Sequence, residues 1–146
     1  FRAGCITGSR HAGVPLHGFL SYLTKCILSG EKYTIIGYQG KQVRDNIHAH
    51  DMVSAIDAFF EAPGVAGVYN MGGGRFSNTS VLEAIELIQE MTGREASVGY
   101  SDVPRQGDHI WYVSDVSKFQ NDFPAWRYTY SLEDILEEMA KQTAVA

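Results

Sequence analysis

The fold of this chain is decided by the stretch Gln42-Val43-Arg44-Asp45-Asn46-Ile47-His48-Ala49-His50-Asp51. It lies between a predicted strand at residues 33–36 and a strongly amphipathic predicted helix at about residues 52–60, which starts near His50 or Asp51. An arginine just before a helix can hold an anion, because its guanidinium matches phosphate oxygens and the helix start offers free N–H groups. Arg44 is therefore a candidate anion ligand, although a local ion pair of Arg44 with Asp45 would also explain the pattern.

Segments typical of strands and of helices alternate along the chain. Runs of β-formers predict strands at residues 33–36, 67–71 and 96–100, and a short buried strand at residues 1–6. Helical spacing predicts helices at residues 17–29, 52–60, 80–91 and 131–139, with a short fifth helix near residues 115–120. The broad apolar face of the second helix predicts that it is buried. The alternation predicts an α/β fold of mixed short strands and four to five helices.

Composition limits the classes of function. The 146 residues are 45% hydrophobic and 20% charged, which is typical of one soluble globular domain with a real core. A net charge of −5 argues against general nucleic-acid binding, which needs a basic face. There is no membrane-spanning apolar run and no signal peptide, and Cys5 and Cys26 form no CxxC pair, so we expect a cytoplasmic protein with free thiols. Because the chain opens on a strand-like segment without methionine, we expect it to be the later part of a longer protein.

Several motifs of enzyme chemistry are missing from the sequence. It contains no G-x-G-x-x-G fingerprint, no G-x-S-x-G elbow and no tyrosine followed four residues later by lysine. The glycines at 72–74 better fit a strand end where the backbone approaches something closely than a phosphate cradle. His48, His50 and Asp51 could form a metal triad, but Asp51 is better explained as a helix cap. We therefore assign no catalytic and no metal-binding residue.

Four pieces of the sequence nevertheless occur in an order shared with one enzyme family. They are Arg2 with Thr7-Gly8 and Leu16-His17-Gly18, Val43-Arg44-Asp45-Asn46-Ile47-His48 with Asp51, Val68-Tyr69-Asn70-Met71-Gly72-Gly73 with Ser80, and Arg105-Gln106-Gly107-Asp108. Together they resemble the C-terminal part of extended short-chain dehydrogenases/reductases, the NAD-dependent nucleotide-sugar epimerase/dehydratase family. The residues at 1–8, 18–23 and 40–48 are most similar to the CDP-paratose 2-epimerase branch. The resemblance implies a partial Rossmann-like fold, the C-terminal half of the family's.

The resemblance implies a nucleotide site built around two arginines. Arg44 and Arg105 match family arginines that contact the nucleotide diphosphate, and arginines from two separate loops could grip it from two sides. Asp108 would sit near the nucleotide ribose, although Gly-Asp is also ordinary turn chemistry. His17 lies at the start of the helix that covers the nucleotide in relatives.

Four further residues complete the expected site. Ile35 and Ile36 lie in the segment that flanks the base in relatives, where apolar side chains can sandwich it. Asn70 matches an asparagine near the substrate lobe, or it only bridges backbone groups. Cys5 stands where many relatives have an asparagine that faces the sugar, although a small buried thiol is the commoner role.

Departures from the family limit what the chain is expected to do. Ser9 stands where the family usually has proline, and the family's first half, with its NAD fingerprint and Tyr-x-x-x-Lys pair, is missing. We therefore expect no cofactor in this chain, although the intact family uses NAD. We expect the substrate-binding portion of a nucleotide-sugar epimerase, not catalytic alone, with a nucleotide diphosphate sugar as ligand. The alternatives are a stand-alone nucleotide-binding module and a structural remnant that oligomerises. Without the family's first half, the sheet would have exposed edges, and such edges bind partners. We therefore expect a homo-oligomer or a separate NAD-binding half as partner.

Overall fold

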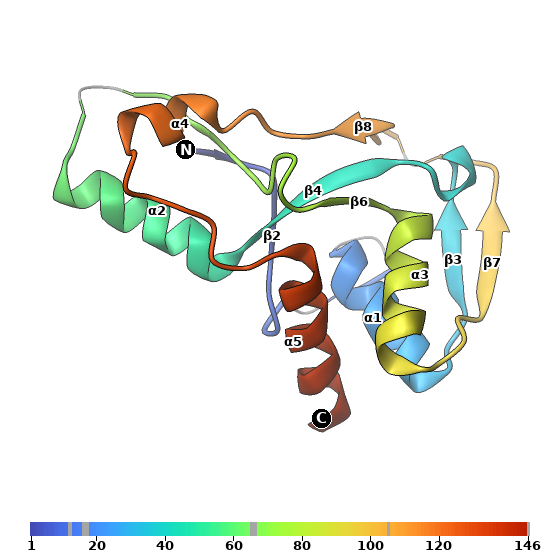
Figure 1. The fold of residues 1–146 in the computed structure, drawn as a ribbon. Coiled ribbons are helices and arrows are strands. Elements are labelled where there is room, and N and C mark those ends of the chain that lie inside the picture. Colours follow the sequence, from blue (N-terminus) through green and yellow to red (C-terminus); the bar gives the residue numbers. More distant parts are fainter. Residues whose placement is uncertain (12, 16–17, 65–66, 105, 146) are drawn as a thin grey trace.

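The computed structural model describes residues 1–11, 13–15, 18–64, 67–104 and 106–145 (Figure 1). In chain order the elements are β1 (Arg2–Ala3), β2 (Cys5–Thr7), α1 (Phe19–Ser29), β3 (Tyr33–Ile36), the 3-10 turn η1 (Tyr38–Gly40), β4 (Val43–His48), α2 (Ala49–Glu61), β5 (Asn70–Met71), β6 (Asn78–Ser80), α3 (Val81–Thr92), β7 (Val98–Ser101), β8 (Trp111–Tyr112), α4 (Ser117–Asp122) and α5 (Leu132–Val145). Strands and helices alternate, so the predicted mixed α/β architecture is confirmed.

Strand β4 is the centre of the largest sheet. It pairs in parallel with β2 and β8 and antiparallel with β6, whereas β1–β5 and β3–β7 form two separate parallel pairs. The register places Cys5 opposite Asn46 and Arg44 opposite Thr79. Side chains alternate between the two faces of a strand, so Arg44 and Asn46 share one face of β4 and Asp45 takes the other.

The structure corrects the interpretation of residues 42–51. Most of this stretch is strand and not loop, and α2 begins at Ala49 with His48 as its N-cap, whose Nδ1 accepts from the His50 N–H at 3.1 Å. The helix starts five residues after Arg44, which in an extended strand corresponds to a distance of about 16 Å. The N–H groups of α2 therefore do not contribute to an anion site at Arg44.

The expected cap role of Asp51 is also wrong. Its carboxylate is fully buried and accepts from the backbone N–H groups of Thr129 and Tyr130 at 3.0 and 3.1 Å. Asp51 therefore ties the start of α2 to the segment that leads into α5, which lies far along the chain.

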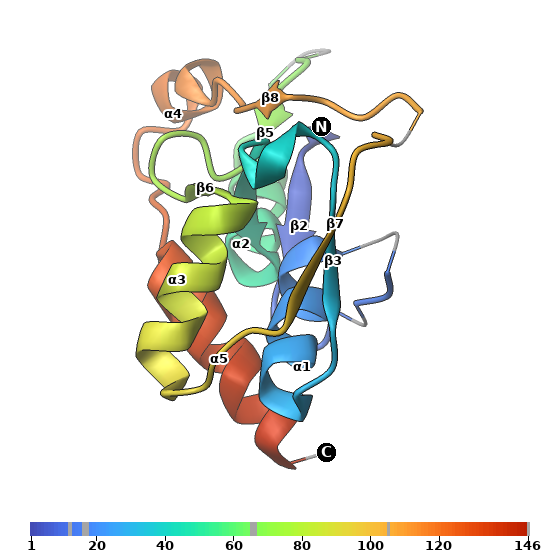
Figure 2. The same ribbon diagram turned by 90° about the vertical axis from the view of Figure 1, so that its right-hand side faces the viewer.

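Two apolar clusters form the core. The larger one packs α1, α3 and α5 together with β3 (Figure 2). Its central side chains include Leu23, Ile88 and Ile135. The second cluster packs α2 and α4 against β4 and β5 and is rich in aromatic rings, among them Phe119 and Trp126. In the described part of the chain, no helix has the length and apolar content that a membrane crossing needs.

Elements with strong local signals match the structure closely. The strand at residues 33–36 is confirmed as β3, and α1, α3, α4 and α5 all lie where helices were predicted. Gly30 and Gly93 end α1 and α3 in the left-handed conformation that favours glycine. The capping box at the start of α3 has both of its hydrogen bonds: the Glu83 N–H donates to the Ser80 hydroxyl oxygen, and the Ser80 N–H donates to the Glu83 carboxylate.

The predicted burial fails at two places. The strand expected at residues 1–6 splits at Gly4 into β1 and β2, and both residues of β1 are exposed. Helix α2 is covered on only part of its broad apolar face: Met52 and Ala55 are buried, whereas Val53, Ile56 and Phe60 are 64%, 47% and 75% exposed. A stripe of apolar side chains on α2 therefore faces away from the described core.

Candidate functional site

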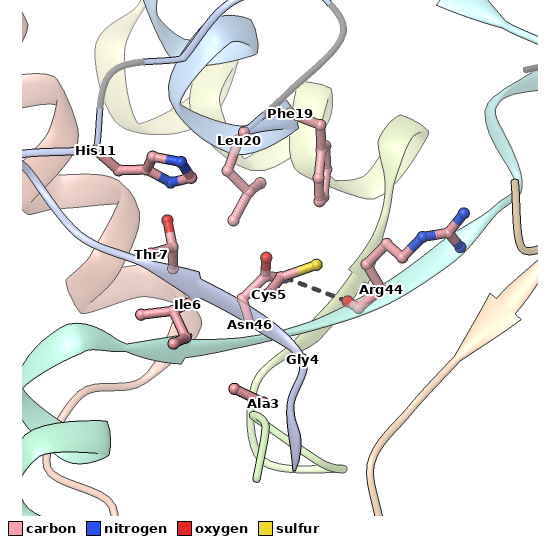
Figure 3. A pocket seen from close by; sticks show the side chains of 11 residues that line it. Ala3, Gly4, Cys5, Ile6, Thr7, His11, Phe19, Leu20, Arg44 and Asn46 are labelled. Atoms are coloured by element: carbon pink, nitrogen blue, oxygen red, sulfur yellow. Dashed lines mark hydrogen bonds between the residues drawn. The ribbon is translucent and has the colours of Figure 1, made fainter. Parts of the chain in front are cut away.

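A pocket of about 490 Å³ opens between α1 and the strands β2 and β4. Figure 3 shows Phe19 and Leu20 on its α1 side and Cys5, Asn46 and Arg44 on its strand side. Its walls are formed by Ala3, Gly4, Cys5, Ile6, Thr7, His11, Gly18, Phe19, Leu20, Arg44 and Asn46.

The parallel pairing of β2 and β4 produces this arrangement. Cys5 lies opposite Asn46, and strand alternation brings Arg44 to the same face of β4 as Asn46. Asn46 is almost fully buried, and its amide donates to the Arg44 carbonyl oxygen at 3.2 Å. The sequence analysis missed Asn46, although its position two residues after Arg44 is the signal that would have identified it.

Arg44, which lines the pocket, is held in place by Asp108. Its Nη2 donates to Asp108 Oδ1 at 2.6 Å, and its Nη1 donates to the Val43 carbonyl oxygen at 2.7 Å. The two side chains of the ion pair are only 13% and 9% exposed. The structure thus brings together Arg44 and Asp108, two of the residues expected in the site.

The alternative ion pair of Arg44 with Asp45 is wrong. Asp45 lies on the opposite face of β4, fully buried, and its Oδ2 accepts from the backbone N–H groups of Gly74 and Ser114, both at 2.9 Å. A Cβ on Gly72 would lie 2.2 Å from the same oxygen. Gly72 and Gly73 therefore serve close backbone approach to β4, as predicted, and the N–H of Gly74 is already bonded to Asp45.

A second, smaller pocket of about 40 Å³ adjoins the first. It is lined by Pro15, Phe19, Tyr33, Ile36, Gln42, Arg44 and Val81. Phe19 and Arg44 belong to both pockets, so Arg44 lies at the boundary between them. The two isoleucines expected to flank a base separate here, because Ile36 lines the small pocket and Ile35 packs into the larger core cluster.

The remaining expected residues take different places. Cys5 lines the larger pocket. Burial raises the pKa of its thiol, the nearby charge of Asp45 raises this pKa further, and the charge of Arg44 acts in the opposite direction. Asn70 is exposed on β5, opposite Arg2 of β1, and lines neither pocket. His17 and Arg105 lie outside the described residues.

A third cluster occupies the far end of β4. His48 Nε2 lies 2.7 Å from Glu138 Oε2, and Glu138 Oε1 accepts from the Ser9 hydroxyl at 2.7 Å. The His48 ring stacks on Tyr130 with centroids 3.9 Å apart. Among the described residues, no group of three histidine, cysteine, aspartate or glutamate side chains is placed to hold a metal ion.

Comparison with known proteins gives this geometry a context. The profile of the NAD dependent epimerase/dehydratase family matches residues 2–72, which include β2, β4 and Arg44. CDP-paratose 2-epimerase from Salmonella typhi is 30% identical over 152 residues, an alignment that covers 99% of this chain and 44% of that protein. This chain belongs to the NAD-dependent epimerase/dehydratase family.

Solved structures of this epimerase/dehydratase family share the fold. MoeE5 in complex with UDP-glucuronic acid and NAD superimposes with a TM-score of 0.83 at 27% identity, over 99% of this chain and 46% of MoeE5. UDP-glucose 4-epimerase from Thermotoga maritima, solved with UDP-glucose, gives 0.83 at 28% identity, over 99% of this chain and 45% of that protein. The predicted Rossmann-like class is thereby confirmed, and the chain spans less than half the length of these relatives.

Proposed function

We propose that this chain is the nucleotide-sugar-binding portion of an NAD-dependent epimerase, and that Arg44 and Arg105 bind the diphosphate. One observation carries the proposal: Arg44, largely buried, lies at the boundary of two adjoining pockets. The parts of a nucleoside diphosphate sugar follow a matching order, because its doubly charged diphosphate lies between the nucleoside, with its base, and the sugar. The guanidinium of arginine is suited to such a centre because its planar fork of donors fits phosphate oxygens in pairs.

The sizes and linings of the pockets suggest how the ligand lies. The base would take the smaller, mostly apolar pocket beside Ile36, where flat rings can be covered by apolar side chains. The sugar would take the larger pocket beside Cys5 and Asn46, whose polar groups can meet hydroxyls. Asp108 holds Arg44 between the two and would come close to the ribose. Both cysteines are free thiols, which fits the cytoplasm that we propose as the compartment.

NAD does not fit the glycine cluster that the described residues offer. A Cβ on Gly73 would lie 2.2 Å from the Asn46 carbonyl oxygen, so the backbone there is already packed against β4 and gives a pyrophosphate no room. We therefore derive no hydride-transfer step from this chain and place no catalytic residue in it. In the proposed function, a separate NAD-binding half would supply that chemistry.

The apolar stripe of α2 supports a proposal about partners. Val53, Ile56 and Phe60 are spaced along one side of α2, and Phe1 nearby is 44% exposed and packs edge-on against Phe59. Apolar surface of this kind usually marks an interface. We propose that a second copy of the chain covers it when the chain is alone, or a separate NAD-binding half when one is present.

Calorimetric titration of the chain with CDP, UDP and NAD tests the proposed function. We expect heat of binding with CDP or UDP and none with NAD, because Arg44 already lies between the two pockets and the glycines at 72 and 73 are packed against β4. Binding of NAD alone would contradict the assignment of the pockets. No heat with any of the three would favour the alternative that the chain keeps only the fold and serves as a structural protein.

A further inference from the structure

A buried amide lines the small pocket beside Arg44. Gln42 directly precedes β4, is only 7% exposed and has no part in the proposed diphosphate clamp. Its Nε2 donates to the carbonyl oxygen of Ile36 at 3.1 Å, whereas its Oε1 is buried and accepts no hydrogen bond from the part of the chain that the structure describes. A buried acceptor without a partner is costly, and such a group in a pocket wall suggests that a ligand completes it.

The orientation of this amide is fixed by its neighbour. The Ile36 carbonyl oxygen can only accept a hydrogen bond, so the NH2 group of Gln42 must face it. Turning the amide over would bring two oxygens together and leave the NH2 group on the other side. Gln42 therefore presents an acceptor, and not a donor, to whatever its free end meets.

We infer that Gln42 Oε1 accepts a hydrogen bond from the amino group of a cytosine base, so that this site selects cytidine over uridine nucleotides. The inference rests on the proposed function, in which Arg44 binds the diphosphate. Cytosine presents its 4-amino group as a donor at the position where uracil, like thymine, presents a carbonyl oxygen. In the same pose, uracil would set its oxygen against Gln42 Oε1, and two acceptors would face each other.

The position of Gln42 suits this role. Gln42 and Arg44 are two residues apart and line the same small pocket, so they lie roughly 7 Å apart along the chain direction. That spacing can hold a diphosphate at one end and reach past the ribose to the base at the other. The other side chains of the pocket are mostly apolar, including Phe19, Ile36 and Val81, so Gln42 supplies the polar contact that distinguishes one base from another.

The small pocket has to widen for a base to enter. Its 40 Å³ is about the space of one water molecule, less than a pyrimidine ring fills. Phe19 is only half-buried and separates it from the larger pocket, so rotation of this one side chain would join the two spaces. Opening of this kind lowers the affinity for both nucleotides and leaves the preference between them to Gln42.

Competing titrations with CDP and UDP test the inference on the 146-residue chain. We expect CDP to bind about ten to a hundred times more tightly than UDP, the range set by one buried hydrogen bond lost or made. Gln42→Met keeps the length of the side chain and removes the acceptor, so it should bring the two affinities to within about threefold of each other. The matched control Gln120→Met changes a glutamine of α4 that lines a different surface hollow, and it should keep the preference of the wild type.

A ligand variant keeps the test independent of the folding of Gln42→Met. The 5′-diphosphate of the pyrimidin-2-one riboside lacks the 4-amino group, and the wild-type chain should bind it more weakly than CDP. Equal affinity of the wild type for CDP and UDP would overturn the inference and leave the proposed function standing. If neither nucleotide binds, the proposed function fails, and the role of Gln42 fails with it.

Discussion

Arg44 in β4 and Asp108 in the turn before β8 form an ion pair, with 2.6 Å between Nη2 and Oδ1. The partners are 64 residues apart in the sequence. Gly107, with φ of +75°, allows the turn that brings Asp108 back to the strand. Asp108 thus holds the guanidinium at the boundary of the two pockets, which is where the proposed function requires it.

Replacing Arg44 should weaken nucleotide binding. We expect Arg44→Ala to bind CDP at least about tenfold more weakly, because a hydrogen bond to a charged group contributes about 1.5–3 kcal/mol. Arg44→Lys should recover only part of this loss, since an ammonium cannot bind phosphate oxygens in pairs. Calorimetry measures both, with Arg127→Ala as control, because Arg127 is exposed and bonds only to backbone carbonyl groups of its own turn. Unchanged affinity in Arg44→Ala would exclude Arg44 from the site.

Asp45 should contribute to stability and not to binding. Asp45→Ala would leave the N–H groups of Gly74 and Ser114 without their acceptor, and we expect a loss of about 2–4 kcal/mol in the free energy of unfolding. Asp45→Asn keeps one acceptor oxygen and should lose less. Urea unfolding at pH 7 measures the change. The control Asp57→Ala, at an exposed position of α2, should stay within about 0.5 kcal/mol of the wild type, and an equal loss in both would refute the assignment.

Local signals explain what the sequence predicted well. The capping box of Ser80 and Glu83 and the terminal glycines Gly30 and Gly93 act within a few residues, so the helices α1 and α3 could be placed from their own sequences. The run of aromatic and β-branched residues at Tyr33–Ile36 likewise identified β3. The family resemblance, and with it Arg44 and Asp108, could be identified because several short motifs keep their order along the chain.

Distant partners explain what the sequence could not predict. β4 carries polar side chains on both faces, which is unusual for a central strand. On one face, the buried Asp45 accepts through Oδ2 from the backbone N–H groups of Gly74 and Ser114, which lie far along the chain. Nothing near Arg44 in the sequence indicates that its partner is Asp108 and not the adjacent Asp45. The faces of a strand also decide which of Ile35 and Ile36 reaches a pocket, and this depends on packing against α1 and α3.

The capping box makes part of the stability depend on pH. Hydrogen bonds from the Ser80 backbone and then its side chain lower the pKa of Glu83 below its ordinary value of 4.5. A carboxylate with a lowered pKa stabilises the fold above its unfolded pKa and loses that effect as pH falls through the folded pKa. Glu83→Ala should therefore cost about 0.5–1 kcal/mol at pH 7 and almost nothing at pH 3. Urea unfolding across this range tests it, with exposed Glu86→Ala of the same helix as the matched control.

The apolar stripe of α2 should drive self-association of the isolated chain. Val53, Ile56 and Phe60 are 64%, 47% and 75% exposed, so replacing all three by serine removes apolar surface at little cost to the core. We expect the wild type to sediment as a dimer or larger species, and the triple variant as a monomer with unchanged thermal unfolding. Leu82→Ser is the matched control, because Leu82 is an exposed apolar residue on α3, at 38% exposure. A wild type that stays monomeric at high concentration and low salt would show that this surface does not bind a second copy, leaving a separate NAD-binding half as its proposed partner.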